Sequence, residues 1–237
     1  MKYRLLGWLL LLPLLLMAQE RPKVAVVLSG GGAKGTAHIG ALKVIEKAGI
    51  PIDYVVGTSM GAIVGGLYAI GYTPEQLDSM VNAQNWKFVL SDAPNPKDVL
   101  LDDRLRSERY VLSIPFTLKS ADISDAGIIK GKNIAQLFSV LTEGYQDSVN
   151  FSRLPIPFAC VSENLVDGSE VVFHRGVLVT AMRSSMSIPG VFAPVNLNGR
   201  VLVDGGMVNN YPVDVALQMG ADIIIGVDVQ SPLLDAG

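Results

Sequence analysis

The sequence predicts an α/β fold with a mainly parallel central sheet. Residues 24–28 and 54–56 are short apolar runs without polar alternation, which is typical of strands that are covered on both faces. Each run leads into a glycine-rich turn and then into a helical pattern, over residues 36–48 and 60–70. Strands that alternate with helices in this way form parallel sheets with helices packed against them.

The turn after the first strand contains three consecutive glycines, Gly30, Gly31 and Gly32. Their backbone amides are unobstructed, and the helix that follows directs its positive end toward the same place. This turn therefore predicts an anion site, for a phosphate or for a transient oxyanion. It lacks the Gly-Lys-Ser/Thr ending of a P-loop, and no acidic residue ends the second strand as a dinucleotide-binding fold requires.

The turn after the second strand, Gly57–Gly61, places Ser59 between a strand and a helix. Small residues on both sides allow a tight bend that lifts the serine hydroxyl clear of the sheet. An ordinary glycine-rich helix start has the same sequence, so the pentapeptide alone leaves both interpretations open. Considered with the first turn, however, it puts a nucleophile beside a set of amide donors, an arrangement that suits acyl transfer.

An irregular middle and a second α/β region follow. Thr73-Pro74-Glu75-Gln76 predicts a helix start with a capping box. Residues 85–124 are rich in proline and aromatic side chains, which fits either a lid or lipid-facing wall, or a peripheral excursion that packs against the core. The remaining predicted elements are helices over residues 132–141, 177–186 and 212–219, and strands over residues 157–162, 170–173, 201–203 and 222–228, the last of them a buried strand.

A carboxylate in a useful position follows the strand over residues 201–203. Asp204 stands at the strand end and is followed by Gly205 and Gly206, so its side chain can reach a neighbouring strand end. A plain turn is the alternative interpretation of Asp-Gly-Gly. The stretch Asn209–Pro212 is expected to order this loop and to start the next helix.

The other candidate nucleophiles and bases are weaker. The two histidines, His38 and His174, do not follow a late strand as a hydrolase histidine does, and we interpret them as surface or packing residues. The single cysteine, Cys160, lies in an apolar run and is expected to be a buried packing residue. Ser184, Ser185 and Ser187 lie at a helix end rather than in an elbow, and we interpret them as capping and turn residues.

Three of these motifs, Ser29–Gly35, Gly57–Gly61 and Asp204–Gly206, stand in the order of the signatures of patatin-like phospholipases, and the chain resembles this family over roughly Lys23 to Val229. The segment Ser185–Pro194 resembles a fourth signature. The resemblance implies a three-layer α/β/α sandwich and a lipid acyl hydrolase with a Ser-Asp dyad. It implies no histidine in the catalytic pair.

Carried over residue by residue, the resemblance makes Ser59 the nucleophile and Asp204 the general base. It makes the amides of Gly30, Gly31 and Gly32 the oxyanion hole. Lys34 stands where the family carries a basic residue and is a candidate for attracting a lipid phosphate, although a solvated lysine at a helix start is the alternative. The glycines that support the motifs are Gly35, Gly57, Gly61, Gly205 and Gly206.

The expected substrate is a phospholipid or another acyl ester, cleaved through an acyl-enzyme without a cofactor. No metal is expected, since the sequence shows no metal-ligand constellation. The alternative function is a catalytically silent lipid- or acyl-binding protein on the same fold.

The N-terminus predicts export. Lys2 and Arg4 precede an almost wholly apolar run, Leu5–Met17, and the small residue Ala18 follows. This pattern predicts a signal peptide over residues 1–19 and a single hydrolase domain over residues 20–237. A transmembrane anchor is the alternative, but a run of about 13 apolar residues is short for a bilayer. The expected location is the bacterial envelope, at the outer membrane or cell surface, or the medium.

Charge and chain ends complete the expectations. The 237 residues carry a net charge of −3, which argues against nucleic acid and against general attraction to anionic lipid, so contact with a membrane surface has to be local and apolar. The chain resembles some exported bacterial members of the family that continue into a periplasmic repeat and an outer-membrane β-barrel. The chain is therefore expected to be the passenger portion of a longer protein of the autotransporter type. By analogy alone, the same relatives suggest a homodimer.

Overall fold

The structure is a computed structural model that describes residues 21–94 and 129–230. The predicted signal peptide, most of the predicted lid region (residues 95–124) and the chain end at residues 231–237 lie outside the described residues. None of the helices within the described ranges is long and apolar enough to cross a bilayer.

A seven-stranded mixed sheet forms the centre of the described chain. Six strands follow the order β7-β8-β4-β2-β1-β9, and β5 pairs with β4 away from this path. The strands of this sheet are β1 (Val24–Leu28), β2 (Tyr54–Thr58), β4 (Phe158–Asn164), β5 (Ser169–Phe173), β7 (Val195–Leu197), β8 (Arg200–Asp204) and β9 (Ile223–Val227). A separate antiparallel pair is formed by β3 (Val149–Asn150) and β6 (Arg175–Gly176).

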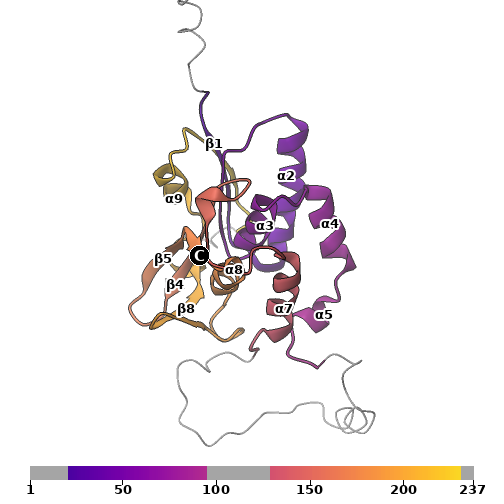
Figure 1. The fold of residues 1–237 in the computed structure, drawn as a ribbon, viewed down its shortest axis with the longest axis vertical. Helices are drawn as coiled ribbons and strands as arrows, with labels where there is room; N and C mark the ends of the chain where they lie inside the picture. Colours follow the sequence, from indigo (N-terminus) through magenta and orange to yellow (C-terminus); the bar gives the residue numbers. More distant parts are fainter. Residues whose placement is uncertain (1–20, 95–128, 231–237) are drawn as a thin grey trace, which may run out of the picture.

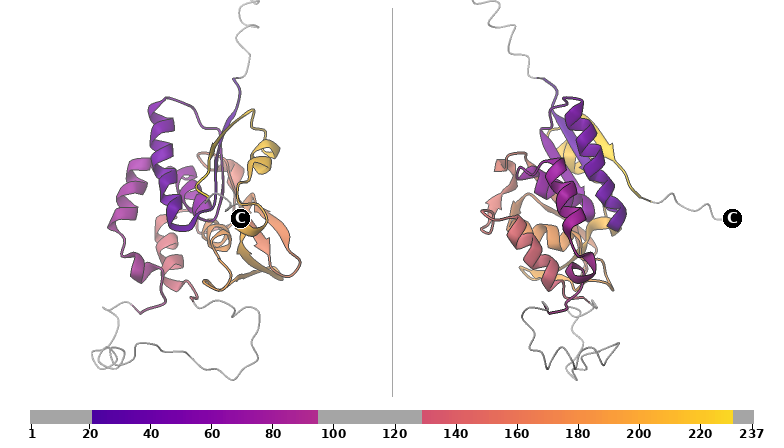
Figure 2. Two further views of the ribbon diagram at one scale, coloured as in Figure 1. Left: turned by 180° about the vertical axis from the view of Figure 1, so that it is seen from behind. Right: turned by 90° about the vertical axis from the view of Figure 1, so that its right-hand side faces the viewer.

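Helices cover both faces of the sheet, so the predicted three layers are confirmed. Figure 1 shows α2, α3, α4 and α7 on one side of the strands and α9 on the other, and Figure 2 shows the same arrangement from two further directions. The α-helices are α2 (Ala37–Lys47), α3 (Met60–Ala69), α4 (Pro74–Ala83), α5 (Trp86–Val89), α7 (Lys132–Leu141), α8 (Leu178–Ser185) and α9 (Val213–Gln218). The described ranges also contain short 3-10 helices at η1 (Gly32–Thr36), η3 (Phe151–Arg153) and η4 (Gly205–Met207).

The apolar strand sequences explain the two layers of helices. Side chains alternate between the faces of a strand, so β1 places Val26 and Leu28 in the larger core under α2 and α3, and Ala25 and Val27 in the smaller core under α9. All five residues of β1 are buried. Because helices cover both faces of β1, the strand has apolar side chains at every position.

Local sequence signals place most helix boundaries. The predicted capping box at the start of α4 is present, with the Thr73 hydroxyl accepting from the Gln76 amide and the Gln76 side chain accepting from the Thr73 amide. The helix predicted over residues 132–141 is α7 with the same bounds.

The strand predicted over residues 222–228 exists as β9, but the prediction that it is buried is wrong. Ile223 is 46% exposed, and no residue of β9 is fully buried. Within the described residues β9 lies at the sheet edge and pairs with β1 alone. An apolar run predicts a strand well, but it does not say which positions of the sheet the strand occupies.

Two strands of opposite direction share one side of β4. The first half of β4 pairs with the parallel strand β2, and its second half pairs with the antiparallel strand β8. The strand β5 occupies the other side along residues 160–164. The carboxyl ends of β2 and β8 therefore point toward each other and meet at the middle of β4.

Candidate active site

The turn between β2 and α3 holds Ser59 in a strained conformation. Its φ of 55° and ψ of −120° lie outside the regions that residues other than glycine usually adopt. The turn can close because position 61 is glycine: a Cβ on Gly61 would lie 2.2 Å from the carbonyl oxygen of Leu28. This is the geometry of a nucleophile elbow, which presents the serine hydroxyl at the carboxyl end of the sheet.

The structure brings Ser59 and Asp204 into direct contact. The Ser59 hydroxyl donates a 2.6 Å hydrogen bond to Oδ2 of Asp204, and Oδ1 of the same carboxylate accepts from the Gly206 amide at 2.8 Å. Both side chains are 6% exposed. Asp204 is thus fixed in one orientation, with one oxygen held by the backbone and the other directed at the serine.

Burial changes the proton affinity of this carboxyl. Desolvation raises the pKa of Asp204 above its ordinary value of 3.8, while the hydrogen bonds from Ser59 and the Gly206 amide act in the opposite direction. A carboxylate with a raised pKa is a better proton acceptor than an ordinary aspartate. Asp204 can therefore accept the proton of the Ser59 hydroxyl as this hydroxyl attacks a carbonyl carbon.

The turn with Gly30, Gly31 and Gly32, the glycine loop, lies directly beside Ser59. A Cβ on Gly30 would lie 3.2 Å from Cβ of Ser59 and 2.2 Å from Oδ1 of Asn210, so a larger residue here would require the Asn210 side chain to move. The Gly30 amide donates to the carbonyl of Asn210, which removes this amide from the predicted oxyanion donors. Among the described residues, the amides of Gly31 and Gly32 have no acceptor, and these two remain the candidates.

A cleft of about 540 Å³ opens above the dyad. Ser59 and Asp204 lie in it together with the glycine loop and Lys34. Its walls include Ile188 and Met207, whose exposed fractions are 39% and 70%. An apolar wall beside a nucleophile and amide donors suits a substrate that carries an acyl chain.

The end of α8 holds both members of the dyad, which sequence reasoning missed. The Ser185 hydroxyl accepts from the Ser59 amide at 2.9 Å and donates to the carbonyl of Val161 at 2.6 Å. Two residues later, the Ser187 carbonyl accepts from the Asp204 amide at 3.0 Å. The sequence alone favours capping and turn roles for these serines, and the signal for their role at the dyad is their place in the fourth signature, Ser185–Pro194.

The loop after Asp204 is ordered as expected. Besides the bond from Gly30 to Asn210, the Thr58 hydroxyl donates to the carbonyl of Asn209 at 2.8 Å. Both contacts use backbone carbonyls of the loop, so it is tied to the glycine loop and to the serine turn at once.

The remaining candidates lie outside the dyad. His38 is fully buried, its Nε2 lies 2.8 Å from the Ser29 carbonyl, and burial lowers its pKa, so it braces the glycine loop as a packing residue. His174 does not line the dyad cleft. Cys160 is a buried free thiol whose pKa is raised by burial.

Comparison with known proteins matches most of the chain to one family. The family model described as patatin-like phospholipase matches residues 26–217, a range that contains the glycine loop, the serine turn and Asp204. The chain belongs to the patatin-like phospholipase family. Members of this family are generally serine hydrolases that act on acyl lipids.

Two curated relatives show how the chain compares in length. An uncharacterized NTE family protein of Mycobacterium tuberculosis is 34% identical over 208 residues, which cover 88% of this chain and 49% of the relative. Patatin-like phospholipase domain-containing protein 6 of Homo sapiens is 31% identical over 210 residues, which cover 88% of this chain and 13% of the relative. The chain thus spans about half the length of the first relative and a small part of the second.

Among solved structures, VipD from Legionella pneumophila has a TM-score of 0.51 at 16% sequence identity. The match covers 81% of this chain and 47% of that protein. At this identity the likeness concerns the fold alone, and it agrees with the mixed, mainly parallel sheet described above.

Proposed function

We propose that this protein is a serine hydrolase that cleaves carboxylic ester bonds of phospholipids or related acyl esters. The observation that carries the proposal is the 2.6 Å hydrogen bond from the Ser59 hydroxyl to the Asp204 carboxylate, formed at a strained turn beside the glycine loop. Family membership supports a lipid ester as the substrate class.

In the first half of the reaction, Oγ of Ser59 attacks the ester carbonyl carbon and passes its proton to Asp204. The negative charge that develops on the carbonyl oxygen is stabilised by the amides of Gly31 and Gly32. Collapse of this intermediate breaks the ester C–O bond. Asp204 returns the proton to the departing alcohol, and the acyl group stays on Ser59.

In the second half, a water molecule replaces the alcohol. Asp204 takes a proton from the water as it attacks the acyl-enzyme, and the same amides stabilise the second oxyanion. Collapse breaks the bond between the acyl carbon and Oγ of Ser59, Asp204 returns its proton to Oγ, and the fatty acid is released. Water and the groups of this chain are sufficient for every step, and no step changes an oxidation state.

Substrate contact and export belong to the same proposal. Lys34 lines the cleft and supplies a positive charge for a lipid phosphate, and the exposed apolar side chains of Ile188 and Met207 offer local contact with a membrane surface.

Export through the signal peptide predicted at residues 1–19 would bring the enzyme to the envelope. N-terminal sequencing of the protein recovered from an envelope fraction tests this last point, and an intact residue 1 would contradict it.

The decisive experiment is labelling with a fluorophosphonate, which reacts with activated serines. We expect labelling of the wild type and none of Ser59→Ala, and hydrolysis across a panel of phospholipids and simple esters to be lost in the same variant. Ser152→Ala is the matched control, because Ser152 is an exposed serine outside the cleft. Equal labelling of wild type and Ser59→Ala, or no labelling of either, would instead favour a silent lipid- or acyl-binding protein.

A further inference from the structure

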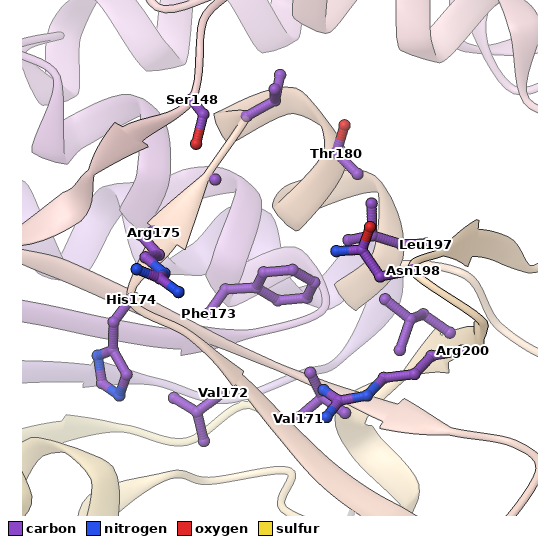
Figure 3. Close-up of a pocket in the computed structure, with 13 residues that line it drawn as sticks. Ser148, Val171, Val172, Phe173, His174, Arg175, Thr180, Leu197, Asn198 and Arg200 are labelled. Atoms are coloured by element: carbon purple, nitrogen blue, oxygen red, sulfur yellow. The ribbon is translucent and has the colours of Figure 1, made fainter.

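A second cleft, larger than that of the dyad, lies between β5, β6, the start of α8 and the hairpin of β7 and β8. Its volume is about 690 Å³, and it shares no lining residue with the dyad cleft. Figure 3 shows the residues that line it. A volume of this size falls within the range of small-molecule sites.

The floor of this second cleft is apolar. Val171, Phe173 and Leu202 are buried residues of the sheet, and all three line the cleft. Figure 3 shows the Phe173 ring in the middle, with Arg175 toward one end and Arg200 toward the other. The floor therefore matches a hydrocarbon chain, and each end carries a cation.

The two arginines have no counter-charge in the described part of the chain. Both are exposed, and neither makes a side-chain hydrogen bond or an ion pair with a described residue. The cleft lining also contains no aspartate or glutamate. In a chain of net charge −3 this is a local concentration of unpaired positive charge. A guanidinium forms paired hydrogen bonds with a carboxylate, which fits its planar fork.

We propose that this cleft binds a long-chain fatty acid, with its chain along Phe173 and its carboxylate on Arg175 or Arg200. The occupant combines the two features of the cleft, because it has one apolar chain and one anionic head. A fatty acid is also the product of the proposed reaction. Binding here does not require turnover, so the two proposals can fail separately.

The helix α8 separates this site from the dyad. Val177 and Thr180 at its start line the second cleft, whereas Ser185 at its end contacts the Ser59 amide. Eight helical residues span about 12 Å. On β8, however, Leu202 of the second cleft and Asp204 of the dyad cleft are two residues apart, so the cross-linked residue itself has to be located within its peptide.

The test is photo-cross-linking of the full chain with a diazirine analogue of palmitic acid, followed by mass spectrometry of the digest. We expect fragment spectra to place the label on residues 171–176 or 197–200, in both the wild type and Ser59→Ala. Excess palmitic acid should remove the label, and excess palmityl alcohol, which has no charge, should not.

Variants test the charge and the cavity separately. The double variant Arg175→Ala/Arg200→Ala should lose at least tenfold of the labelling, and the two single variants identify the arginine that holds the head. Arg153→Ala is the control, since Arg153 is exposed outside the cleft. Thr180→Trp, which fills the cleft, should also lose the label while the circular dichroism spectrum is unchanged.

Three outcomes would overturn the proposal. One is undiminished labelling of the double variant, another is equal competition by palmityl alcohol, and the third is label confined to the dyad cleft. If the wild type does not react with the fluorophosphonate but is still cross-linked in the second cleft, the proposed hydrolase is rejected and the fatty acid site is supported.

Discussion

Thr58 and Asp204 lie opposite consecutive residues of one strand, with Thr58 paired to Val161 and Asp204 to Ser162 of β4. The strands β2 and β8 run toward each other along β4. Ser59, the residue that follows Thr58, is therefore placed next to Asp204 at the end of β8. Ser59 and Asp204 are 145 positions apart in the sequence, and their hydrogen bond is a direct result of this pairing.

The first prediction concerns the pH dependence of hydrolysis. Asp204 acts as a base only when ionised, and burial raises its pKa above 3.8. We expect kcat/KM to fall as the pH is lowered, with a midpoint above the ordinary pKa of aspartate. The measurement is the pH profile of hydrolysis of a short fluorogenic ester, with protein folding monitored at each pH. A midpoint at or below 3.8 would contradict the role of Asp204.

The second prediction concerns stability. A raised pKa means that the folded state binds the Asp204 proton more tightly than the unfolded chain does. Its stabilising contribution is therefore fully present below pH 3.8 and is lost as the pH rises through the folded pKa. We expect Asp204→Asn to be more stable than the wild type at pH 7 by about 1.4 kcal/mol per unit of pKa shift.

Urea denaturation of Asp204→Asn and the wild type between pH 4 and pH 7 checks this. The difference in unfolding free energy should shrink as the pH falls. A difference that grows on acidification would show that the sign is wrong. Activity is expected to be absent in the variant at every pH.

The third prediction concerns Ser185, which holds the Ser59 amide and the Val161 carbonyl. Ser185→Ala should lower kcat by about 10- to 100-fold with little change in KM, since each tenfold corresponds to about 1.4 kcal/mol of barrier. Ser184→Ala is the matched control, because among the described residues the Ser184 hydroxyl bonds to the Thr180 carbonyl within α8 and to no other group. Equal kcat values for the two variants would remove Ser185 from the positioning of the nucleophile.

The fourth prediction compares two glycines. A methyl group on Gly61 would meet the Leu28 carbonyl at 2.2 Å, and backbone cannot move aside cheaply. Gly61→Ala should therefore destabilise the fold by roughly 1–3 kcal/mol. Gly40 is exposed within α2 and has nothing within 4 Å of the added position, so Gly40→Ala should stabilise by about 0.5–1 kcal/mol. Thermal unfolding of both variants measures the contrast, and destabilisation of similar size in both would contradict it.

The parts of the fold that the sequence predicted are those with local causes. The buried strand β1 follows from an apolar run, and the start of α4 follows from its capping box, because each pattern acts within a few residues. The serine turn was also predictable, since a strand, a small-residue bend and a helix stand in direct succession.

The parts that were missed depend on distant pairing. The run Val201-Leu202-Val203 predicts a strand, but it does not encode the antiparallel direction of β8 or its place beside the second half of β4. The bond from the Gly30 amide to Asn210 uses a backbone carbonyl, which every residue type carries. Neither contact leaves a sequence pattern, so only the assembled sheet reveals them.

The middle of β4 sets the distance between Ser59 and Asp204, although no side chain of β4 belongs to the dyad. An extra residue between Val161 and Ser162 would lengthen the strand by about 3.3 Å and turn every later side chain to the opposite face. Serine and aspartate would then stand apart on an otherwise intact sheet. The site therefore depends on the number of β4 residues between the partners Thr58 and Asp204, in addition to the buried side chains that β4 gives to the core.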